Sequence, residues 1–331
     1  MQKKNPAKRR PERLVVTLLS LLFLSTAVFA TVKYVFRAPE LDTDKPVVTP
    51  DGTASTDVDR TDTDEPDAPG RTRREYCYNI LVSGLDDDNG GSDTNILVRF
   101  DVPNKRIDLV SLPRDTLLHN DYRNNKLNFA YAKGGTELLM EQIENLLGIP
   151  VDFYVTVNLK GFIALVDQID GVDFDIPINM DYDDPYQDLH IHLSRGTQKL
   201  DGANALKVVR FRHNNDGTGY GSEDIGRMQT QQAFLKAVAK QVLTVSNLGK
   251  VDDFVKIFQS YVETDLTVGN LAWLGKEAIS MGADAIDFST LPNEWKSPYI
   301  YLDQAATLAL INEHLNPYVE DRVPEDLNIP S

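Results

Sequence analysis

An uncharged apolar segment near the start of the chain constrains its architecture more than any other feature. Residues 14–32 carry no charge, and as a helix they would extend about 28 Å, close to the hydrocarbon thickness of a bilayer. Basic residues gather before this segment, at residues 1–13, and basic flanks stay in the cytoplasm. The sequence therefore predicts a cytoplasmic stub, one signal-anchor helix at residues 14–35 and a C-terminal domain outside the cell membrane. The alternative is a signal peptide that is cleaved after Ala30.

Residues 36–75 are acidic, rich in Asp, Thr and Pro, and nearly free of large apolar side chains. Such a segment cannot bury enough apolar surface to offset the entropy lost on ordering, so we expect a disordered acidic linker. The whole chain has a formal net charge of −16. This charge argues against a nucleic-acid partner, because binding phosphate backbones requires clustered Lys and Arg.

A folded domain is predicted at residues 76–317, with a C-terminal tail at residues 318–331. Strands are expected where β-branched and aromatic residues gather, at residues 78–82, 96–100, 107–112 and 153–157. Residues 101–105 have the composition of a turn, so the second and third strands should form a hairpin.

Two helices follow from apolar residues at helical spacing. The first is capped by Thr136 and ends at Gly148, and the second starts near Asp224. Because strands and helices alternate along the domain, we expect an α/β or α+β fold.

Several common sites are excluded by the sequence. It contains no G-x-S-x-G elbow, no Walker phosphate loop and no H-E-x-x-H motif. Cys77 is the only cysteine, so no intramolecular disulfide and no cysteine-based zinc cluster can form, and we expect a small buried or incidental residue. His190 and His192 form an H-x-H pair that can bind a metal, but the segment also fits an alternating edge strand, which we favour.

Three polar clusters remain as candidates for chemistry. The first is the loop at residues 84–94, which holds four carboxylates and three glycines between two apolar strands. Carboxylates at a strand end suit Mg²⁺, although an exposed acidic turn has the same composition. The second is the segment at residues 111–116, where Arg114 follows a strand and can bind a phosphate through two hydrogen bonds. A surface salt bridge is the alternative there.

The third cluster combines a predicted strand at residues 210–213 with the start of the second helix. On a strand, Arg210 and Arg212 point to the same face. On the helix, Arg227 and Gln231 lie one turn apart. Like charges on one face repel unless an anion lies between them, and helix N-termini attract anions. We therefore interpret this cluster as a phosphate or pyrophosphate pocket.

Together these segments resemble the LytR-CpsA-Psr (LCP) family of cell-envelope phosphotransferases over residues 76 to about 317. The matching pieces follow the family's order, at residues 79–81, 84–86, 92–94, 111–116, 126–131, 134–135, 166–167, 171–172, 200–202, 205–206, 210–212 and 224–232. The stub, the single span and the outer domain also fit the family's usual layout.

The resemblance implies a central mixed β-sheet flanked by helices, with an apolar tunnel for a polyprenyl tail. It implies Mg²⁺ (or Mn²⁺) bound by Asp86, Asp93 and the pyrophosphate of the substrate. The positions expected to act in catalysis are Arg114, Asp115, Arg210, Arg212, Arg227 and Gln231. Those expected to bind the pyrophosphate are Arg114, Lys126, Arg210, Arg212, Arg227, Gln231 and Gln232. The reaction would transfer a glycopolymer, such as wall teichoic acid or capsule, from a polyprenyl-pyrophosphate carrier to peptidoglycan.

The sequence departs from the family pattern in two places. Family members commonly carry one or two arginines between the metal-site carboxylates, whereas residues 87–92 contain no cation, and Thr230 stands where an Arg or Lys is common. Weaker pyrophosphate binding, a different substrate, a stronger need for metal and a slow enzyme all stay open. A non-catalytic glycolipid-binding protein and a lipid pyrophosphate hydrolase are the alternative functions. No general base is singled out among Asp86, Asp93 and Asp115.

Overall fold

The computed structural model describes residues 36–41, 47–48, 54–55, 71–86, 91–120, 124–186, 188–220, 223–242, 257 and 260–330. The predicted stub and signal-anchor helix lie outside these residues, as does most of the predicted linker. Within the described part of the chain, no helix is both long enough and apolar enough to cross a membrane.

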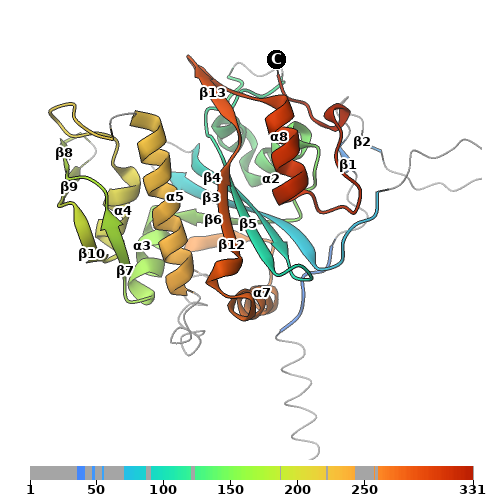
Figure 1. The fold of residues 1–331 in the computed structure, drawn as a ribbon, viewed down its shortest axis with the longest axis horizontal. Coiled ribbons are helices and arrows are strands. Elements are labelled where there is room, and N and C mark those ends of the chain that lie inside the picture. The colour runs from blue at the N-terminus through green and yellow to red at the C-terminus, as the bar shows by residue number, and fades with distance from the viewer. Residues whose placement is uncertain are drawn as a thin grey trace, which may run out of the picture.

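A six-stranded sheet forms the centre of the fold (Figure 1), with the strand order β11-β6-β3-β4-β5-β12. Its strands are β3 (Cys77–Asp86), β4 (Gly91–Asp101), β5 (Arg106–Leu112), β6 (Phe153–Asn158), β11 (Val262–Thr264) and β12 (Ile286–Thr290). β6 pairs in parallel with β3, and β12 with β5, while β4 is antiparallel to both β3 and β5. The carboxyl ends of β3, β5, β6 and β12 therefore lie at one end of the sheet, and this border, which runs across the strand ends, is the edge at which the parallel strands end. The four predicted strands, the hairpin and the mixed sheet are confirmed.

Separate hydrophobic cores lie on the two faces of the sheet, because successive side chains of a strand point to opposite faces. One face is covered by α2 (Leu127–Leu147), α8 (Gln304–Leu310) and the π-helical turn η3 (Ile311–Leu315), and the other by α7 (Val268–Met281). On β3, Leu81 packs into the first core, whereas Tyr78 and Ile80 pack into the second. Helices thus flank the sheet on both sides, as expected.

Helix α2 begins earlier than predicted, at Leu127 rather than near Thr136. The backbone is non-helical at Gly134 and Gly135, where φ is −144° and 68°, and the helix continues after this kink. The sequence analysis recognised only the second half because glycine pairs are typical of helix boundaries. The predicted end at Gly148 is confirmed, since this residue has φ 62° and donates to the carbonyl of Glu144.

A lobe beside the sheet has its own hydrophobic core (Figure 1). It consists of α3 (Leu159–Gln168), β7 (Val172–Ile176), β8 (Met180–Asp184), β9 (Leu189–Leu193), β10 (Gly196–Leu200), α4 (Gly202–Arg210) and α5 (Glu223–Val242). Phe234 on α5 meets Phe174 on β7 edge-to-face, with ring centroids 5.2 Å apart. Because α5 also hydrogen-bonds to β12 through Gln232, it joins the lobe to the sheet.

Contacts between the two ends of the described domain cross the predicted boundaries at residues 75/76 and 317/318. Arg71 pairs with Asp326 at 2.5 Å, and Thr72 N donates to Glu320 Oε2 at 2.8 Å. Leu327 packs into the core under α2. The remaining elements are β1 (Val47–Val48), β2 (Ala54–Ser55), β13 (Asn293–Lys296), β14 (Tyr299–Leu302), η2 (Ala283–Ala285) and η4 (Pro324–Asp326).

Cys77, the first residue of β3, is fully buried. Burial removes the hydration of the thiolate and raises the pKa of this thiol to about 11. At neutral pH the side chain is therefore an uncharged thiol, which confirms the expectation of a buried cysteine.

A buried charge network lies near the edge of the sheet where the parallel strands begin. Asp108 is 1% exposed and binds Arg99 at 2.7 Å, Arg106 at 2.8 Å and His314 Nδ1 at 2.9 Å. Arg99 also donates to the carbonyl of Glu313 at 3.0 Å, so the network ties η3 to the sheet.

Replacing Asp108 with Ala should lower the free energy of unfolding by about 3–5 kcal/mol, because Arg99 would be left as an uncompensated buried charge. Urea unfolding followed by circular dichroism measures the change. Asp287→Ala is the matched control: this carboxylate lies 3.8 Å from His314 but is 60% exposed, so its loss should cost less than about 1 kcal/mol. Equal, small effects of the two substitutions would contradict this account.

Candidate active site

Part of the predicted site lies at the end of the sheet where the parallel strands end. There β3 ends at Asp86, β5 at Leu112 and β12 at Thr290, while β4 begins at Gly91. In open sheets with parallel strands, ligands bind outside the carboxyl ends of the strands, where the loops that follow them meet. Fold and sequence therefore predict a site at the same edge.

Arg114, Asp115 and Lys126 form an ion-paired group beyond the end of β5. Asp115 Oδ1 lies 3.0 Å from Lys126 Nζ and 3.8 Å from Arg114 Nε. The Arg114 side chain is 40% exposed, compared with 23% for Lys126. A guanidinium and an ammonium group meet at one carboxylate here, and both are side chains that bind phosphates.

Backbone contacts position this group. Lys126, the N-cap residue of α2, forms an antiparallel bridge with Leu117. Asn128, the second residue of α2, donates its backbone N–H to Arg114 O at 2.9 Å. The predicted segments 111–116 and 126–131 are thus one structural unit, although they are separated in the sequence.

Asp86 and Asp93, the predicted metal ligands, belong to the adjacent strands β3 and β4 rather than to one long loop, which corrects the sequence prediction. The pairing register shifts between Gly84 and Leu85, so that Asp93 is the extra residue of a β-bulge. Bulges re-aim side chains and are common next to active sites. A Cβ on Gly91 would lie 3.9 Å from the Asn128 carbonyl, so this hairpin end adjoins the ion-paired group.

One buried side-chain oxygen at the hairpin end is suited to a hard cation. Ser92 Oγ is buried and has no hydrogen-bond partner among the described residues, and such orphaned hydroxyls are rare in native proteins. Carboxylate and hydroxyl oxygens are the ligands that Mg²⁺ prefers. The side chains of Asp86 and Asp93 are outside the description, and their backbone positions on one hairpin support the prediction.

The prediction of a strand at residues 210–213 is wrong. Arg210 is the last residue of α4, and the buried Phe211 follows it in extended backbone. Asp201 caps the start of this helix by accepting a hydrogen bond from Asn204 N at 2.8 Å, and an Asp before an apolar run is a helix-start signal in the sequence. Arg210 is half-buried and Arg212 is exposed, so the two arginines flank an anchored aromatic ring instead of sharing a strand face.

Helix α5 confirms that Arg227 and Gln231 lie one turn apart, although the side chain of Arg227 is outside the description. The two predicted glutamines hydrogen-bond within the protein. Gln231 Nε2 donates to the Val209 carbonyl at 2.8 Å, and Gln232 Nε2 donates to Thr290 Oγ1. They fix α5 to the end of α4 and to the end of β12, beside the ion-paired group. These contacts hold α5 in place and are the roles that the structure shows for the two glutamines.

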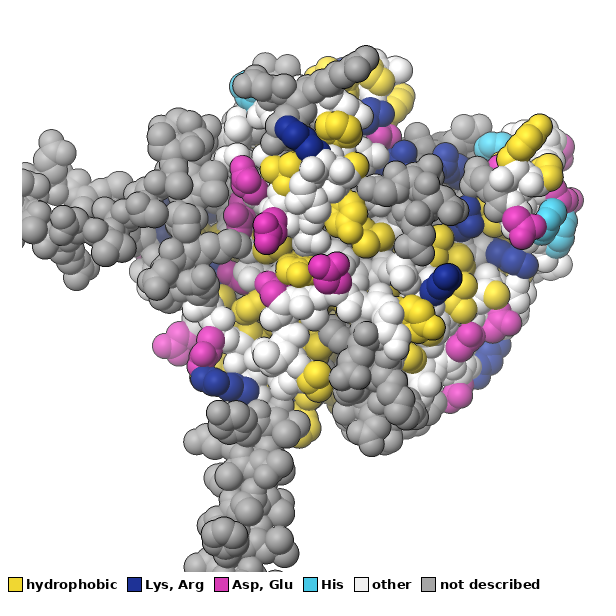
Figure 2. Space-filling model, turned by 180° about the vertical axis from the view of Figure 1, so that it is seen from behind, with side chains coloured by type: hydrophobic (Ala, Val, Ile, Leu, Met, Phe, Trp, Pro, Cys, Tyr) yellow, Lys and Arg dark blue, Asp and Glu magenta, His cyan; other side chains and the backbone are white. Residues whose placement is uncertain are grey.

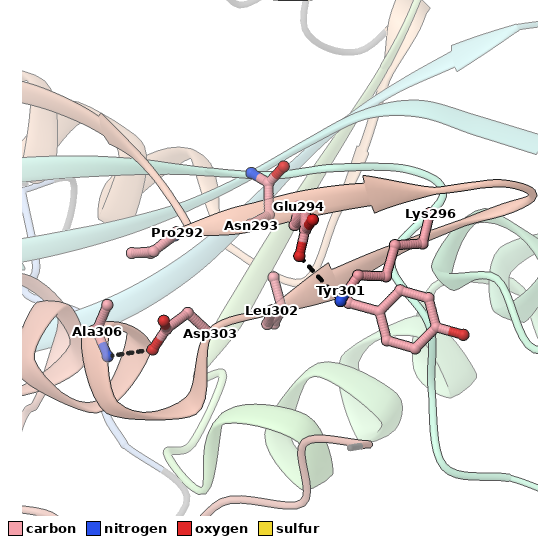
Figure 3. Close-up of a pocket in the computed structure, with 8 residues that line it drawn as sticks. All are labelled: Pro292, Asn293, Glu294, Lys296, Tyr301, Leu302, Asp303 and Ala306. Carbon is pink, nitrogen blue, oxygen red and sulfur yellow. Dashed lines mark hydrogen bonds and ion pairs between the residues drawn. The ribbon is translucent and has the colours of Figure 1, made fainter.

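A polar pocket of about 420 Å³ lies on the hairpin of β13 and β14 (Figure 3). It is lined by Pro292, Asn293, Glu294, Lys296, Tyr301, Leu302, Asp303 and Ala306. β14 adjoins the ion-paired group, since Ile300 N donates to Asp115 O and Leu117 N donates to Ile300 O, both at 2.9 Å. Figure 3 shows Glu294 paired with Lys296, at 2.9 Å. Polar groups of these kinds can hydrogen-bond a hydroxyl-rich ligand.

The sequence analysis missed Thr290 and Ile300 because they lie far along the chain from the groups they contact. The local sequence around Thr290 and Ile300 indicates only two short apolar segments, which form β12 and β14 in the structure. Thr230, which replaces a common family cation, is 6% exposed and donates to the Gly226 carbonyl at 2.9 Å. The Thr230 hydroxyl therefore bonds the backbone of its own helix and adds no positive charge to the predicted anion site.

The alternating strand favoured for His190 and His192 is confirmed as β9, which exposes both rings. A hydrogen bond between His190 and Asp183 raises the pKa of the imidazole and lowers the pKa of the carboxyl. The charged forms gain most from that bond.

Comparison with known proteins identifies the family. The profile of the LytR_cpsA_psr family matches residues 48–316, and the chain belongs to this family. The polyisoprenyl-teichoic acid–peptidoglycan teichoic acid transferase TagV of Bacillus subtilis is 33% identical over 201 residues, which are 58% of this chain and 50% of TagV. The enzyme of the same name from Bacillus cereus, TagU, is 31% identical over 243 residues, 71% of this chain and 76% of TagU.

The crystal structure of B. subtilis TagV has the same fold, with a TM-score of 0.61 and 28% identity over 73% of this chain and 98% of that chain. The chain spans about half the length of curated relatives such as TagV. Family membership and fold are therefore established for the domain they share.

Arg114→Ala should weaken binding of farnesyl pyrophosphate by about 1.5–3 kcal/mol, the usual worth of a charged hydrogen bond. Thermal stability should change little, because this side chain is substantially exposed. Isothermal titration calorimetry measures the affinity, with Arg195→Ala, an exposed arginine of the lobe, as the control. Unchanged affinity together with a lower melting temperature would show that Arg114 is structural.

Proposed function

We propose that this chain transfers a glycopolymer from a polyprenyl-pyrophosphate carrier to peptidoglycan and joins them by a phosphodiester. The names of TagV and TagU assign such a transfer of teichoic acid to those relatives. The observation that carries the proposal is the meeting of Arg114 and Lys126 at Asp115, where the parallel strands of the sheet end.

In this reaction a hydroxyl oxygen of the acceptor attacks the sugar-bound phosphorus, and the bond to the polyprenyl phosphate breaks. The hydroxyl proton leaves with a base or with solvent, and polyprenyl phosphate departs with the bonding electrons. Phosphoryl transfer depends mainly on positioning and on cations around the phosphate oxygens. Arg114 and Lys126 would bind these oxygens, and Arg210, Arg212 and Arg227 would approach from the lobe.

Asp86 and Asp93 would hold Mg²⁺ or Mn²⁺. The ion would supply charge neutralisation on the pyrophosphate. Because residues 87–92 contain no cation, the protein's own arginines neutralise less charge here than is common in the family.

A second function, non-catalytic binding of lipid-linked glycans, is favoured by the same missing cations. Thr230 hydrogen-bonds the backbone of its own helix, and the side-chain amides of Gln231 and Gln232 donate to groups within the protein. Such a protein would bind the carrier lipid without turnover. A lipid pyrophosphate hydrolase would differ in using water as the acceptor.

The activity test is transfer of a lipid-linked saccharide to peptidoglycan fragments by the full chain. EDTA should abolish transfer, and Mg²⁺ or Mn²⁺ should restore it. Asp93→Asn should slow transfer by more than about 100-fold, since an amide is a poorer ligand for a hard cation. The control is Asp284→Asn, which changes an exposed carboxylate on η2.

Robust transfer in EDTA would refute the metal role. Tight binding of the lipid with no turnover in any metal would favour the non-catalytic function, and release of free saccharide phosphate would favour the hydrolase.

We also propose a single membrane span at residues 14–35 with the C-terminal domain outside. Protease added to intact cells should remove a C-terminal epitope tag and leave a tag placed after Met1 intact. The basic residues before the span keep the amino terminus inside. A protected C-terminal tag, or a mature protein that starts at Thr31, would contradict this topology.

A further inference from the structure

The hairpin of β8 and β9 carries potential metal ligands on its exposed face. Asp183 lies directly opposite His190, and Asp181 lies opposite His192. All four residues are exposed, whereas the other residues of β9 are buried in the lobe. Figure 2 shows histidine side chains next to acidic ones at the end of the molecule that the lobe occupies. None of these residues belongs to the candidate active site.

The distances within this His–Asp cluster suit one ion. His190 Nδ1 hydrogen-bonds Asp183 Oδ1, and His192 Nε2 lies 3.4 Å from the same oxygen. One ligand atom from each of Asp183, His190 and His192 can be chosen so that all lie within 4.8 Å of one another. In a tetrahedral site with bonds of about 2.0–2.1 Å, neighbouring ligand atoms are about 3.3 Å apart. Small side-chain rotations are therefore sufficient to form the site.

We propose that Asp183, His190 and His192 bind one Zn²⁺ ion, or a divalent transition metal of similar chemistry. The fourth ligand is a water molecule, and Asp181 Oδ1, 2.7 Å from His192 Nδ1, accepts the proton of that second ring nitrogen. Two imidazoles favour zinc over Mg²⁺ and Ca²⁺, which take oxygen ligands. Both rings bind as neutral imidazoles, so a ring that is protonated in the free protein releases one proton to solvent when the ion binds and keeps the proton on its other nitrogen.

The fold gives such an ion a structural effect. Among the described strands, β8 and β9 pair with each other alone, and isolated two-stranded hairpins are marginally stable. On β8, Asp181 N donates to Asn214 Oδ1 at 2.7 Å and Asp183 N donates to Asn215 Oδ1 at 2.6 Å. These asparagines follow Arg212, so an ion on this hairpin would also steady the segment that leads from α4.

The test is zinc binding by the full chain, purified without added metal and titrated with ZnCl₂ in excess Mg²⁺, which keeps hard-cation sites saturated. Wild-type protein should bind one equivalent and melt at a higher temperature in zinc. His192→Asn and Asp183→Asn should each weaken binding by more than about 100-fold, because loss of a direct ligand exceeds the usual effect of an outer one. His119→Asn removes an exposed histidine elsewhere and should bind zinc like wild type.

Failure of the wild-type chain to bind zinc would overturn the proposal, as would affinity that is unchanged in both cluster variants. Circular dichroism establishes that each variant is folded, and these exposed side chains are replaced without disturbing a core. Cobalt(II) provides a second readout: tetrahedral coordination should give visible absorption in wild type that both cluster variants lack. Octahedral cobalt absorption in the wild-type protein would also count against the site. Neither measurement depends on the transferase activity proposed above.

Discussion

The candidate site depends on the parallel pairing of β3 with β6 and of β5 with β12. This pairing sends four strands in one direction, and β4 returns between two of them so that its first residues reach the same edge. Reversing β5 alone would move Arg114 by the length of that strand, roughly 20 Å at about 3.3 Å per residue. The group around Arg114 and the hairpin of Asp86 and Asp93 adjoin each other only because of strand direction.

Charged side chains are buried at one end of the sheet and partly exposed at the other. Where the parallel strands begin, Asp108 is buried between Arg99, Arg106 and His314, and the charges are satisfied within the protein. Where the strands end, the ion-paired group keeps Arg114 accessible. A buried charge without a partner is strongly destabilising, so the ion pairs of Asp108 stabilise the fold. The exposed part of Arg114, where the strands end, can be reached by an anion from solvent.

The lobe carries the remaining predicted arginines, on α4, directly after it and on α5. Its core is separate, and α5 connects it to the sheet through the hydrogen bond from Gln232 to Thr290. Arg210 and Arg212 sit on either side of Phe211, whose burial fixes the end of α4. The proposed pyrophosphate site would draw cations from the sheet and from the lobe, which have separate cores. This arrangement accounts for a reaction in which positioning of phosphate oxygens matters more than any single catalytic group.

The sequence by itself determined the four central strands, the hairpin, the end of α2 at Gly148 and the residues of the ion-paired group, because alternation and helix caps are local consequences of backbone geometry. It did not decide whether Arg210 ends a helix or lies in a strand, because a short apolar run fits both periods. Only the tertiary structure revealed the bulge at Asp93, the contact of Ile300 with Asp115 and the aspartates opposite His190 and His192. Each depends on which segments pair across the fold, and pairing is set by packing between residues far apart in the chain.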